Sequence, residues 1–478
     1  MSNFEFLSQE TKLLIHKKAL EILAETGVQI DSKEILEKLE GFGAEVDYEN
    51  CQARFSKGMV EEAIKRCPSK FVLGGVQEEY DMYLGEGNTY VLTDTQGCFV
   101  SDLKTGERRN STMKDLLDAA RVTDAMDYIH CFAPIVIAGD VPEGSRTIRE
   151  MVEIFKVSSK HVETDCFNEA QAKYYIEVLR KLFREDVLLE RPPLSITCCP
   201  VSPLIFEAPM LTGTIAMGEI NTPVLLLPMP ISGTTAPMTL LGTIIQNTAE
   251  VLAGITILQS FTPGRKIIFG SADGIMDMKS LLCCVGSPEG ALVNAANIEM
   301  GHFYNMPALG CNGTDAHKPN YQMGFERGSS NLPLFLAHGD MICGVGMGSS
   351  AMCLYLEELV NCEDVMNISR RIAQGIQDDE KLALAGVVKK VGPGGNFLNE
   401  KSTIKQLRNG EHYSPRNLIR RPYDKADPAD MVEASKARVR EILAAPPKKN
   451  FSDQIEQEVE EILKRADVEC AEAAAEEE

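Results

Sequence analysis

Eight short apolar runs recur along the middle of the chain, and a stretch with helical character follows each of them. The runs span residues 89–93, 131–138, 161–164, 195–199, 223–227, 266–270, 307–310 and 341–346. Eight alternations of strand and helix are the number found in a (β/α)8 barrel, a fold that carries its chemistry at the carboxyl ends of the strands. The pattern predicts an α/β protein built on a TIM barrel, with its site residues directly after these runs.

The chain divides into three regions on this interpretation. Residues 1–87 form a helical N-terminal region, with helices expected from residue 8 to Gly27, over 33–39 and over 57–65. Residues 88–377 form the barrel, in which a hairpin near 98–110 turns at Gly106. Residues 378–478 form a C-terminal extension, with a glycine turn at 392–395 expected to pack over the barrel mouth. Its acidic end is expected to be an exposed helix that frays into a disordered tail.

The composition limits the partners and the compartment. The chain has 48 basic and 70 acidic residues and a formal charge of −22, which disfavours binding to nucleic acid. Its 14 cysteines include no CxxC pair, and we recognise no signal peptide. No uninterrupted apolar run is long enough to cross a bilayer. We expect a soluble, cytoplasmic protein with reduced thiols and no membrane contact.

Carboxylates follow two of the predicted strands. Asp94 and Gln96 come directly after the first run, and Glu163 and Asp165 lie two residues apart, on one face of the third strand. Carboxylates at the ends of barrel strands can bind a cation or transfer a proton. The alternative is that each carboxylate is only hydrogen-bonded to neighbouring loop amides.

The loop after the seventh run is the richest in polar groups. It contains Asn312, Thr314, Asp315, His317 and Lys318, and function concentrates on such loops of a rigid barrel. The alternative role for Asp315 is to cap the helix after Pro319. We favour a functional role for the loop.

Other kinds of chemistry find no support in the motifs. The seven histidines show neither HxH nor HExxH spacing, and no GxSxG is present, so we expect neither a metal site nor a serine nucleophile. The adjacent pairs Cys198–Cys199 and Cys283–Cys284 lie in apolar surroundings, which raise a thiol pKa. Residues 392–395 lack the strand and the GKS/T ending of a phosphate loop.

Four segments in order resemble the trimethylamine methyltransferase (MttB) superfamily. They are residues 20–28 (LEILAETGV), 102–109 (DLKTGERR), 313–326 (GTDAHKPN…QMGFE) and 391–398 (VGPGGNFL). The resemblance runs over roughly residues 5–445 and implies a (β/α)8 barrel. Because the founding members carry pyrrolysine and this chain has none, it resembles the non-pyrrolysine branch.

The resemblance also implies an activity. It predicts an enzyme that moves a methyl group from a quaternary amine, of the betaine or carnitine kind, to the Co(I) centre of a separate corrinoid protein. No cofactor would be bound permanently, because the cobalamin belongs to the partner, and we expect a homo-oligomer. The expected catalytic residues are Asn312 and Asp315, and room for the corrin is expected beside Gly346 and Gly348. The expected substrate-binding residues are Tyr90, Asp94, Gln96, Asp165, Phe206, His317 and Tyr321.

The chain departs from its relatives at three positions. Gly344, Asn396 and Ser402 stand where some relatives have histidine, so any role of those histidines is lost or rebuilt here. For a betaine carboxylate, Lys318 and Arg416 are the candidate partners. Two alternatives stay open: a catalytically inactive barrel that binds a corrinoid protein, and a methyltransferase for a tertiary amine or a sulfonium compound.

Overall fold

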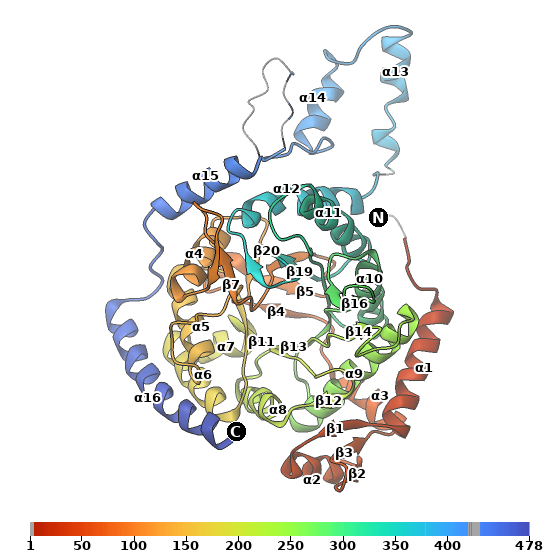
Figure 1. The fold of residues 1–478 in the computed structure, drawn as a ribbon. Coiled ribbons are helices and arrows are strands. Elements are labelled where there is room, and N and C mark those ends of the chain that lie inside the picture. The colour runs from red at the N-terminus through yellow and green to blue at the C-terminus, as the bar shows by residue number, and fades with distance from the viewer. Residues whose placement is uncertain (1–3, 378, 419, 421, 423–430, 478) are drawn as a thin grey trace.

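The protein folds around a closed barrel of eight parallel strands, as the alternation predicted. The structure is a computed structural model that describes residues 4–477 except 378, 419, 421 and 423–430. The barrel strands, in chain order, are β6 (Tyr90–Thr93), β9 (Cys131–Phe132), β10 (His161–Asp165), β11 (Leu194–Cys198), β13 (Val224–Leu226), β15 (Ile267–Ser271), β18 (Ala308–Cys311) and β19 (Met341–Val345). Each strand pairs with the next, and β19 pairs with β6 to close the ring (Figure 1).

Helices cover the outside of the barrel. They are α4 (Met113–Asp124), α5 (Arg146–Val157), α6 (Glu169–Leu182), α7 (Glu185–Glu190), α8 (Ala208–Ala216), η2 (Met217–Ile220), α9 (Leu240–Phe261), α10 (Pro288–Phe303), α11 (Tyr321–Leu336) and α12 (Glu358–Ala373). Asn168, Ser287 and Asn320 each accept a backbone hydrogen bond at the start of α6, α10 and α11, which satisfies an otherwise unpaired N–H of the first turn. These caps fix where each helix begins.

Helix α9 is the most buried of these helices. It has 22 residues and contains an 18-residue apolar stretch with a mean hydropathy of 1.3, so that by length and composition alone it would suffice to cross a membrane. In the fold, however, 72% of this apolar stretch is buried, with α1 and α3 packed against the helix. Burial of this kind is what the core helix of a globular fold shows, and it explains why α9 is apolar all round.

A hairpin closes the amino-terminal end of the barrel. Strands β4 (Phe71–Leu73) and β5 (Met82–Leu84), joined through η1 (Glu78–Tyr80), pair antiparallel. Their buried side chains form one cluster with residues of the barrel interior, among them Leu92, Leu225, Ile268, Leu309 and Met341. The carboxyl end of the strands is therefore the end left for chemistry, as expected for this fold.

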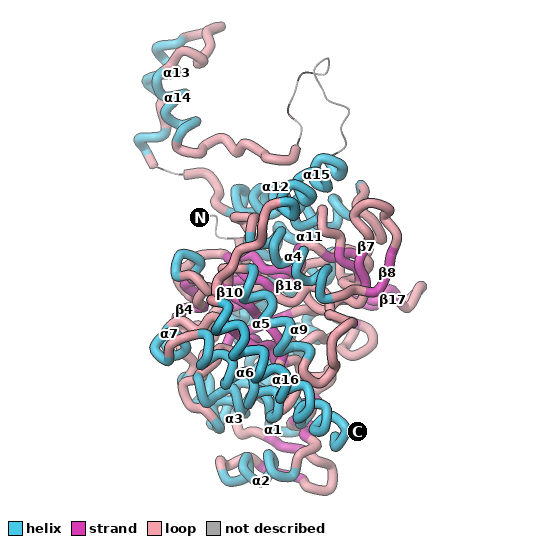
Figure 2. Tube along the Cα trace, turned by 90° about the vertical axis from the view of Figure 1, so that its left-hand side faces the viewer, coloured by secondary structure: helices cyan, strands magenta, loops and turns pink. Residues whose placement is uncertain are grey.

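Two small sheets stand at that carboxyl end, which we call the mouth. The expected hairpin is present as β7 (Phe99–Ser101) and β8 (Arg108–Asn110), and it extends a sheet with β20 (Met347–Gly348) and β21 (Cys353–Leu354). The second sheet consists of β14 (Ile231–Ser232), β16 (Gly274–Asp277) and β17 (Leu282–Cys284). Figure 2 shows β7, β8 and β17 at one end of the molecule and β4 at the other.

The N-terminal region contains the three expected helices, α1 (Gln9–Glu25), α2 (Lys33–Gly41) and α3 (Lys57–Arg66). It also contains five strands that we did not expect. Two are β4 and β5 of the hairpin described above, and the other three, β1 (Val28–Ile30), β2 (Glu45–Asp47) and β3 (Gln52–Arg54), form a sheet with β12 (Ile205–Phe206). Three-residue strands are too short to show an alternating pattern. The region is therefore mixed α and β, and the division at residues 87 and 377 stays a prediction.

The C-terminal extension differs from its prediction in two respects. Helix α16 (Asp453–Glu477) packs along α6, and Val459, Leu463, Ala466 and Cys470 are buried beneath it. The prediction of an exposed, fraying tail is therefore wrong for residues 453–473, because the helix has an apolar stripe as well as many acidic residues. Helix α15 (Met431–Ala444) likewise packs on α12 and α4.

The second difference concerns the segment before α15. After η3 (Glu380–Leu382), helices α13 (Ala385–Val391) and α14 (Lys401–Arg408) project away from the body. In Figure 2 they point away from the end that carries β7 and β8. The glycine turn at 392–395 joins these two helices. It does not pack over the mouth, so the prediction that it would do so is wrong.

Candidate active site at the barrel mouth

Two carboxylates of β10 face the barrel interior. Glu163 is 3% exposed, and its Oε1 accepts a hydrogen bond from Thr197 Oγ1 on β11 at 2.7 Å. Its Oε2 has no hydrogen-bond partner among the described residues. Asp165, two residues later on the same face, is half-buried and accepts a hydrogen bond from Gln96 Nε2. A buried carboxylate oxygen without a partner is costly, so it indicates a place for a ligand group.

Burial changes the acidity of these groups. It raises the pKa of Glu163 and of Asp165 to about 7, and that of Asp94 to about 6, although the charge of Arg327 lowers the last of these. All three therefore titrate near neutral pH, since desolvation penalises the charged form of a carboxyl group. Such groups can hold a proton, or ionise when a cation comes beside them.

Asp94 and Gln96 lie directly after β6, as the sequence predicted. Asp94 N donates to Val345 O at 3.0 Å, and Gln96 N donates to Pro134 O at 3.0 Å. Gln96 has a φ of 61°, a left-handed conformation that is uncommon for a residue other than glycine. The surrounding hydrogen bonds hold this conformation, and the Gln96 side chain reaches Asp165. The structure thus brings Gln96 and Asp165 together, with Asp94 beside them in the chain; their role in substrate binding stays a prediction.

Three thiols accompany the carboxylates in the interior. Cys199 and Cys311 pack on the interior cluster that contains Cys343, and Cys343 Sγ donates to Thr93 O at 3.3 Å. A hydrogen bond with Cys311, together with burial, raises the pKa of Cys343, and burial raises that of Cys199. The raised pKa keeps Cys199 and Cys343 in the thiol form, which is a poor nucleophile. Among the described residues, no three His, Cys, Asp or Glu are grouped so as to hold a metal ion.

The two residues expected to be catalytic hold the mouth together. Asp315 accepts hydrogen bonds from Val285 N at 3.0 Å, Gly286 N at 3.2 Å and Ser350 Oγ at 2.8 Å. It thereby joins the loop after β17 to the turn between β20 and β21. It does not cap α11, because Asn320 does so. With these bonds made, the geometry favours a supporting role for Asp315.

Asn312 is likewise engaged by the protein itself. Its Nδ2 donates to Cys343 O at 2.5 Å, and its Oδ1 accepts from Asn331 Nδ2 at 3.2 Å. The side chain is buried, and it ties the end of β18 to β19 and α11. A direct contact between Asn312 and a substrate stays a prediction that this geometry does not favour.

A strained turn adjoins this loop. Ser349, Ser350 and Ala351 all have φ between 54° and 62°, a conformation that costs energy in residues with a side chain. Ser349 N and Ser350 N donate to the carbonyls of the β18 loop, and His317 Nδ1 lies 3.1 Å from Ser349 Oγ. His317 thus lies at the mouth but is exposed. Tyr321, at the start of α11, is 88% exposed, so it does not form the wall of a substrate pocket.

Two of the predicted substrate-binding aromatic residues are not at the mouth. Tyr90 is the first residue of β6, so it lies at the closed end of the barrel, where its hydroxyl accepts a hydrogen bond from Tyr83 N of β5. Phe206 is buried outside the barrel, in β12, which pairs with β1. The prediction that they shape a cation pocket is wrong, because a strand's first residue faces the opposite end and β12 belongs to another sheet.

The glycines after β19 serve packing. A Cβ on Gly346 would lie 2.6 Å from Ile135 Cδ1, and one on Gly348 would lie 2.7 Å from Met323 Cε. Side chains of the protein therefore fill the room that we had expected for a corrin. At Gly344, φ is 115° and a Cβ would lie 2.0 Å from Asn312 O, so a histidine could not replace it in this backbone.

The remaining departures from the relatives lie elsewhere. Asn396 and Ser402 are on the projecting segment of α13 and α14. Arg416 pairs with Glu363 at 2.8 Å and with Asp127, four residues before β9, on the side of the barrel's closed end. Lys318 is exposed in the β18 loop. Neither basic residue lies among the interior carboxylates.

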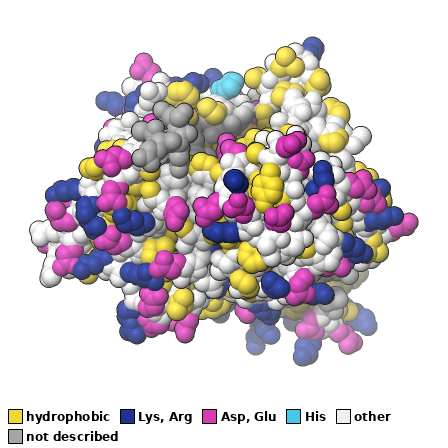
Figure 3. Space-filling model, turned by 90° about the horizontal axis from the view of Figure 1, so that it is seen from below, with side chains coloured by type: hydrophobic (Ala, Val, Ile, Leu, Met, Phe, Trp, Pro, Cys, Tyr) yellow, Lys and Arg dark blue, Asp and Glu magenta, His cyan; other side chains and the backbone are white. Residues whose placement is uncertain are grey.

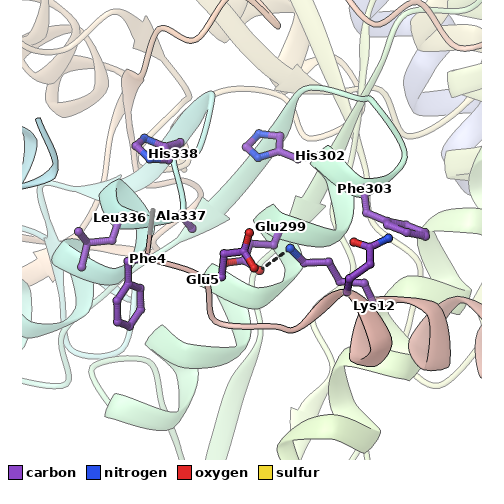
Figure 4. A pocket seen from close by; sticks show the side chains of 10 residues that line it. Phe4, Glu5, Lys12, Glu299, His302, Phe303, Leu336, Ala337 and His338 are labelled. Carbon is purple, nitrogen blue, oxygen red and sulfur yellow. Dashed lines mark ion pairs between the residues drawn. The ribbon is translucent and has the colours of Figure 1, made fainter. Parts of the chain in front are cut away.

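A pocket of about 300 Å³ lies far from the mouth. Figure 4 shows it between the N-terminal segment and the carboxyl-terminal ends of α10 and α11, with Glu299 paired to Lys12. Glu299 also accepts from Phe6 N and Leu7 N. The pocket therefore marks where the N-terminal segment is fastened to the barrel. On the face seen in Figure 3, acidic and basic side chains are interspersed.

The fold and the mouth define the class of protein. A closed (β/α)8 barrel, plugged at one end and carrying carboxyl groups that titrate near neutrality at the other, is the arrangement of a TIM-barrel enzyme. Residues 1–471 match the family model described as trimethylamine methyltransferase (MTTB). The chain therefore belongs to the trimethylamine methyltransferase family, and it is a methyltransferase.

Individual relatives agree with this assignment. The chain is 30% identical over 403 residues to the trimethylamine methyltransferase MttB of Desulfitobacterium hafniense (strain DSM 10664 / DCB-2), covering 84% of this chain and 81% of that protein. It is 28% identical over 377 residues to the glycine betaine methyltransferase of D. hafniense (strain Y51), covering 77% and 78%.

A solved structure supports the fold. The crystal structure of the Methanosarcina barkeri monomethylamine methyltransferase (MtmB) superposes with a TM-score of 0.54 at 12% identity, covering 92% of this chain and 88% of that one. At this identity the likeness concerns the fold alone.

Proposed function

We propose that this protein transfers a methyl group from a quaternary amine to the Co(I) centre of a separate corrinoid protein. The observation that supports it most directly is the group of recessed carboxyl groups, Glu163, Asp165 and Asp94, at the mouth of a barrel of this family. Carboxylates attract a cationic nitrogen. A glycine betaine methyltransferase among the relatives agrees with a quaternary donor.

The reaction breaks one C–N bond and forms one Co–C bond. The electron pair of the C–N bond stays on nitrogen, which leaves as a neutral tertiary amine, and the Co(I) centre of the partner supplies the pair for the new bond. A quaternary nitrogen needs no proton to become a leaving group. The protein therefore has to orient the cation and exclude water, a task that we assign to Asp94, Gln96 and Asp165.

The partner would approach from the mouth. The opposite end is closed by β4 and β5, whereas the two accessory sheets stand on either side of the ring of strand ends. We infer that the corrinoid protein docks between these sheets, with its cobalt aimed at the carboxyl end of β10. The cytoplasmic compartment stays a prediction.

A methyl-transfer assay tests the proposal. The protein is mixed with Co(I) cobalamin or with a cognate corrinoid protein, and methylcobalamin is followed by its absorption spectrum with one amine at a time. We expect one quaternary amine to give methylcobalamin, and Asp165→Asn to slow the reaction at least tenfold. Glu190→Gln, an exposed acidic residue at the end of α7, is the matched control and should leave the rate unchanged.

Absence of methylcobalamin with every quaternary amine and both acceptors would overturn the proposal. It would favour a barrel that only binds a corrinoid protein. A protonated tertiary amine is a second candidate donor, because carboxyl groups with a pKa near 7 leave such an amine protonated. Methyl transfer from trimethylamine alone would select it.

A further inference from the structure

We infer that the methyl donor is a cation without a carboxylate of its own, of the tetramethylammonium or choline type, rather than a betaine. This inference rests on the proposed function and names the substrate class of the same site. It is carried by the distribution of charged groups around the mouth and by the unpaired Oε2 of Glu163.

The first residues after each barrel strand include acidic but no basic side chains, and the first basic residues of the β18 loop are His317 and Lys318, farther along the chain. Residues 94–97, 133–138, 165–168, 199–202, 227–232, 272–274, 312–316 and 346–352 include no Lys, Arg or His. They do include Asp94, Asp165, Asp273 and Asp315. A betaine carboxylate placed among these groups would be repelled and would have no cationic partner.

The nearest basic side chains are not available to a ligand. Arg327 of α11 is 1% exposed, and its guanidinium donates to Gly344 O, Met347 O and Asn312 Oδ1. Its positive charge lowers the pKa of Asp94, but its guanidinium is not exposed to a ligand. Lys318 and Lys279 are exposed in outer turns, and Arg109 is paired with Asp115 at 2.7 Å.

Glu163 is the second, independent observation. Its side chain is buried in the interior, with Oε1 satisfied by Thr197 and Oε2 without a partner among the described residues. A trimethylammonium head offers no hydrogen-bond donor but does offer positive charge, which a carboxylate oxygen attracts. The aromatic residues expected to form a cage, Tyr90, Phe206 and Tyr321, do not meet, so the carboxylates are left to hold the cation.

The affinity should depend on pH in a defined direction. Burial raises the pKa of Glu163 and Asp165 to about 7, and a permanent cation favours their ionised forms. Binding therefore strengthens as the pH rises through 6–7. The other groups that face them are Asp94, Gln96, Thr197, the cysteines Cys199, Cys311 and Cys343, and Glu150 of α5, whose pKa is itself raised to about 7 by burial.

The test measures binding and transfer on the whole protein. Dissociation constants for tetramethylammonium and glycine betaine are determined by calorimetry at pH 6 and pH 8, because neither nitrogen titrates. We expect tetramethylammonium to bind at least tenfold more tightly at pH 8 than at pH 6, and betaine to bind at least tenfold more weakly than tetramethylammonium at pH 8. Glu163→Gln should lose most of the pH dependence, whereas Glu190→Gln should keep it.

Methyl transfer from the same donors separates the two hypotheses. Transfer from betaine but not from tetramethylammonium or choline would overturn this inference and leave the proposed function standing. Binding of tetramethylammonium with the expected pH dependence, without transfer to either acceptor, would support the cation site and overturn the proposed function. Absence of binding by any cation would overturn the inference as well.

An independent observation concerns residues 376–410, which we call the arm. The arm projects from the body (Figures 1 and 2), and Ile376, Val388, Leu398 and Leu407 are exposed on it by 55% to 92%. Helices of seven and eight residues, the lengths of α13 and α14, are marginal in water without packing. The arm therefore requires a surface to pack against.

We propose that this surface belongs to a second copy of the chain. The arm contains six basic residues, Lys381, Lys389, Lys390, Lys401, Lys405 and Arg408, and four acidic ones, Asp378, Asp379, Glu380 and Glu400, so it is net positive in a chain with a formal charge of −22. A basic, apolar arm is complementary to a protein of this acidity. Both ends of the arm are anchored on α12, through Arg371 with Gly375 and Glu411.

Sedimentation velocity over a range of concentrations tests the second proposal. We expect the full chain to self-associate, and Leu398→Asp to shift it to the monomer. Leu189→Asp, which changes an exposed leucine of α7, is the control and should not do so. A monomeric wild-type protein, or self-association unaffected by Leu398→Asp, would overturn the proposal. Association of the arm only with an added corrinoid protein would assign it to that partner and also overturn it.

Discussion

At the scale of single residues, Glu163 has properties that are unfavourable for a side chain with a purely structural role. It is buried, it lies two residues from Asp165 on one strand face, and only one of its oxygens has a partner. A glutamine would satisfy Thr197 without the cost of desolvating a charge. Retaining the carboxyl group makes sense where a positive charge arrives from outside.

Glu163→Gln should therefore change how stability depends on pH. Because burial raises the folded-state pKa of Glu163 to about 7, its stabilising contribution is complete below about pH 4.5, the unfolded value, and is lost as the pH rises toward 7. At pH 8 we expect the variant to be more stable than the wild type, by up to about 3 kcal/mol. Urea unfolding at pH 4.5 and pH 8 measures this. An equal difference at both pH values would contradict it.

Asp315→Ala should loosen the mouth while the barrel stays folded. The variant leaves Val285 N, Gly286 N and Ser350 Oγ without their acceptor, at a cost of about 1–3 kcal/mol. We expect faster hydrogen exchange at Val285 and Gly286 and a large loss of methyl transfer. Asp277→Ala removes an acceptor from an exposed turn and serves as the control. Loss of activity without faster exchange would instead indicate a direct catalytic role for Asp315.

At the scale of elements, the sequence predicts those strands and helices that are long enough to show a recognisable hydrophobic pattern. All eight barrel strands and the hairpin near 98–110 were predicted, because buried parallel strands are continuous apolar runs and a glycine marked the turn. The strands β1 to β5 were missed because they have three residues each. The docking of α16 was missed because its acidic residues conceal the stripe of Val459, Leu463 and Cys470.

The candidate site was predictable in the same uneven way. Period-two alternation placed Glu163 and Asp165 on one face, and position after a strand placed Asp94 and Gln96. The side-chain hydrogen bonds that engage Asn312 and Asp315 join segments between 15 and 35 residues apart, and no local sequence pattern predicts such contacts.

Gly144→Ala tests how closely α16 is docked. A Cβ at this position would lie 2.8 Å from the backbone of Cys470, so the helix must shift, at a cost of about 1–3 kcal/mol. We expect proteolysis and hydrogen exchange to increase over residues 453–473 before the barrel is affected. Gly58→Ala in α3, where nothing lies within 4 Å of the new Cβ, should be neutral or slightly stabilising. Equal behaviour of the two variants would show that α16 is held loosely.

At the scale of the whole molecule, the barrel is closed most sparsely beside the candidate site. Strands β6 and β9 share one paired position, Leu92 with Cys131, and an isolated bridge joins Gly97 to Val136. Between them, Thr93 Oγ1 donates to Ala133 O and accepts from Ala133 N, both at 2.9 Å. A side chain here replaces part of the missing ladder, and Asp94 and Gln96 follow it directly.

Thr93→Val should open this seam while keeping the shape of the side chain. The variant leaves Ala133 N–H buried without an acceptor, which costs about 1–3 kcal/mol and should lower the denaturant midpoint without changing the slope. Thr256→Val is the control, because Thr256 is buried but donates only within α9, to Leu252 O at 2.7 Å. We expect Thr93→Val to lose more stability than Thr256→Val. We also expect it to bind the methyl donor more weakly, since Asp94 and Gln96 depend on the seam for their positions. Equal losses in the two variants, or unchanged donor binding in Thr93→Val, would show that the mouth is positioned independently of barrel closure.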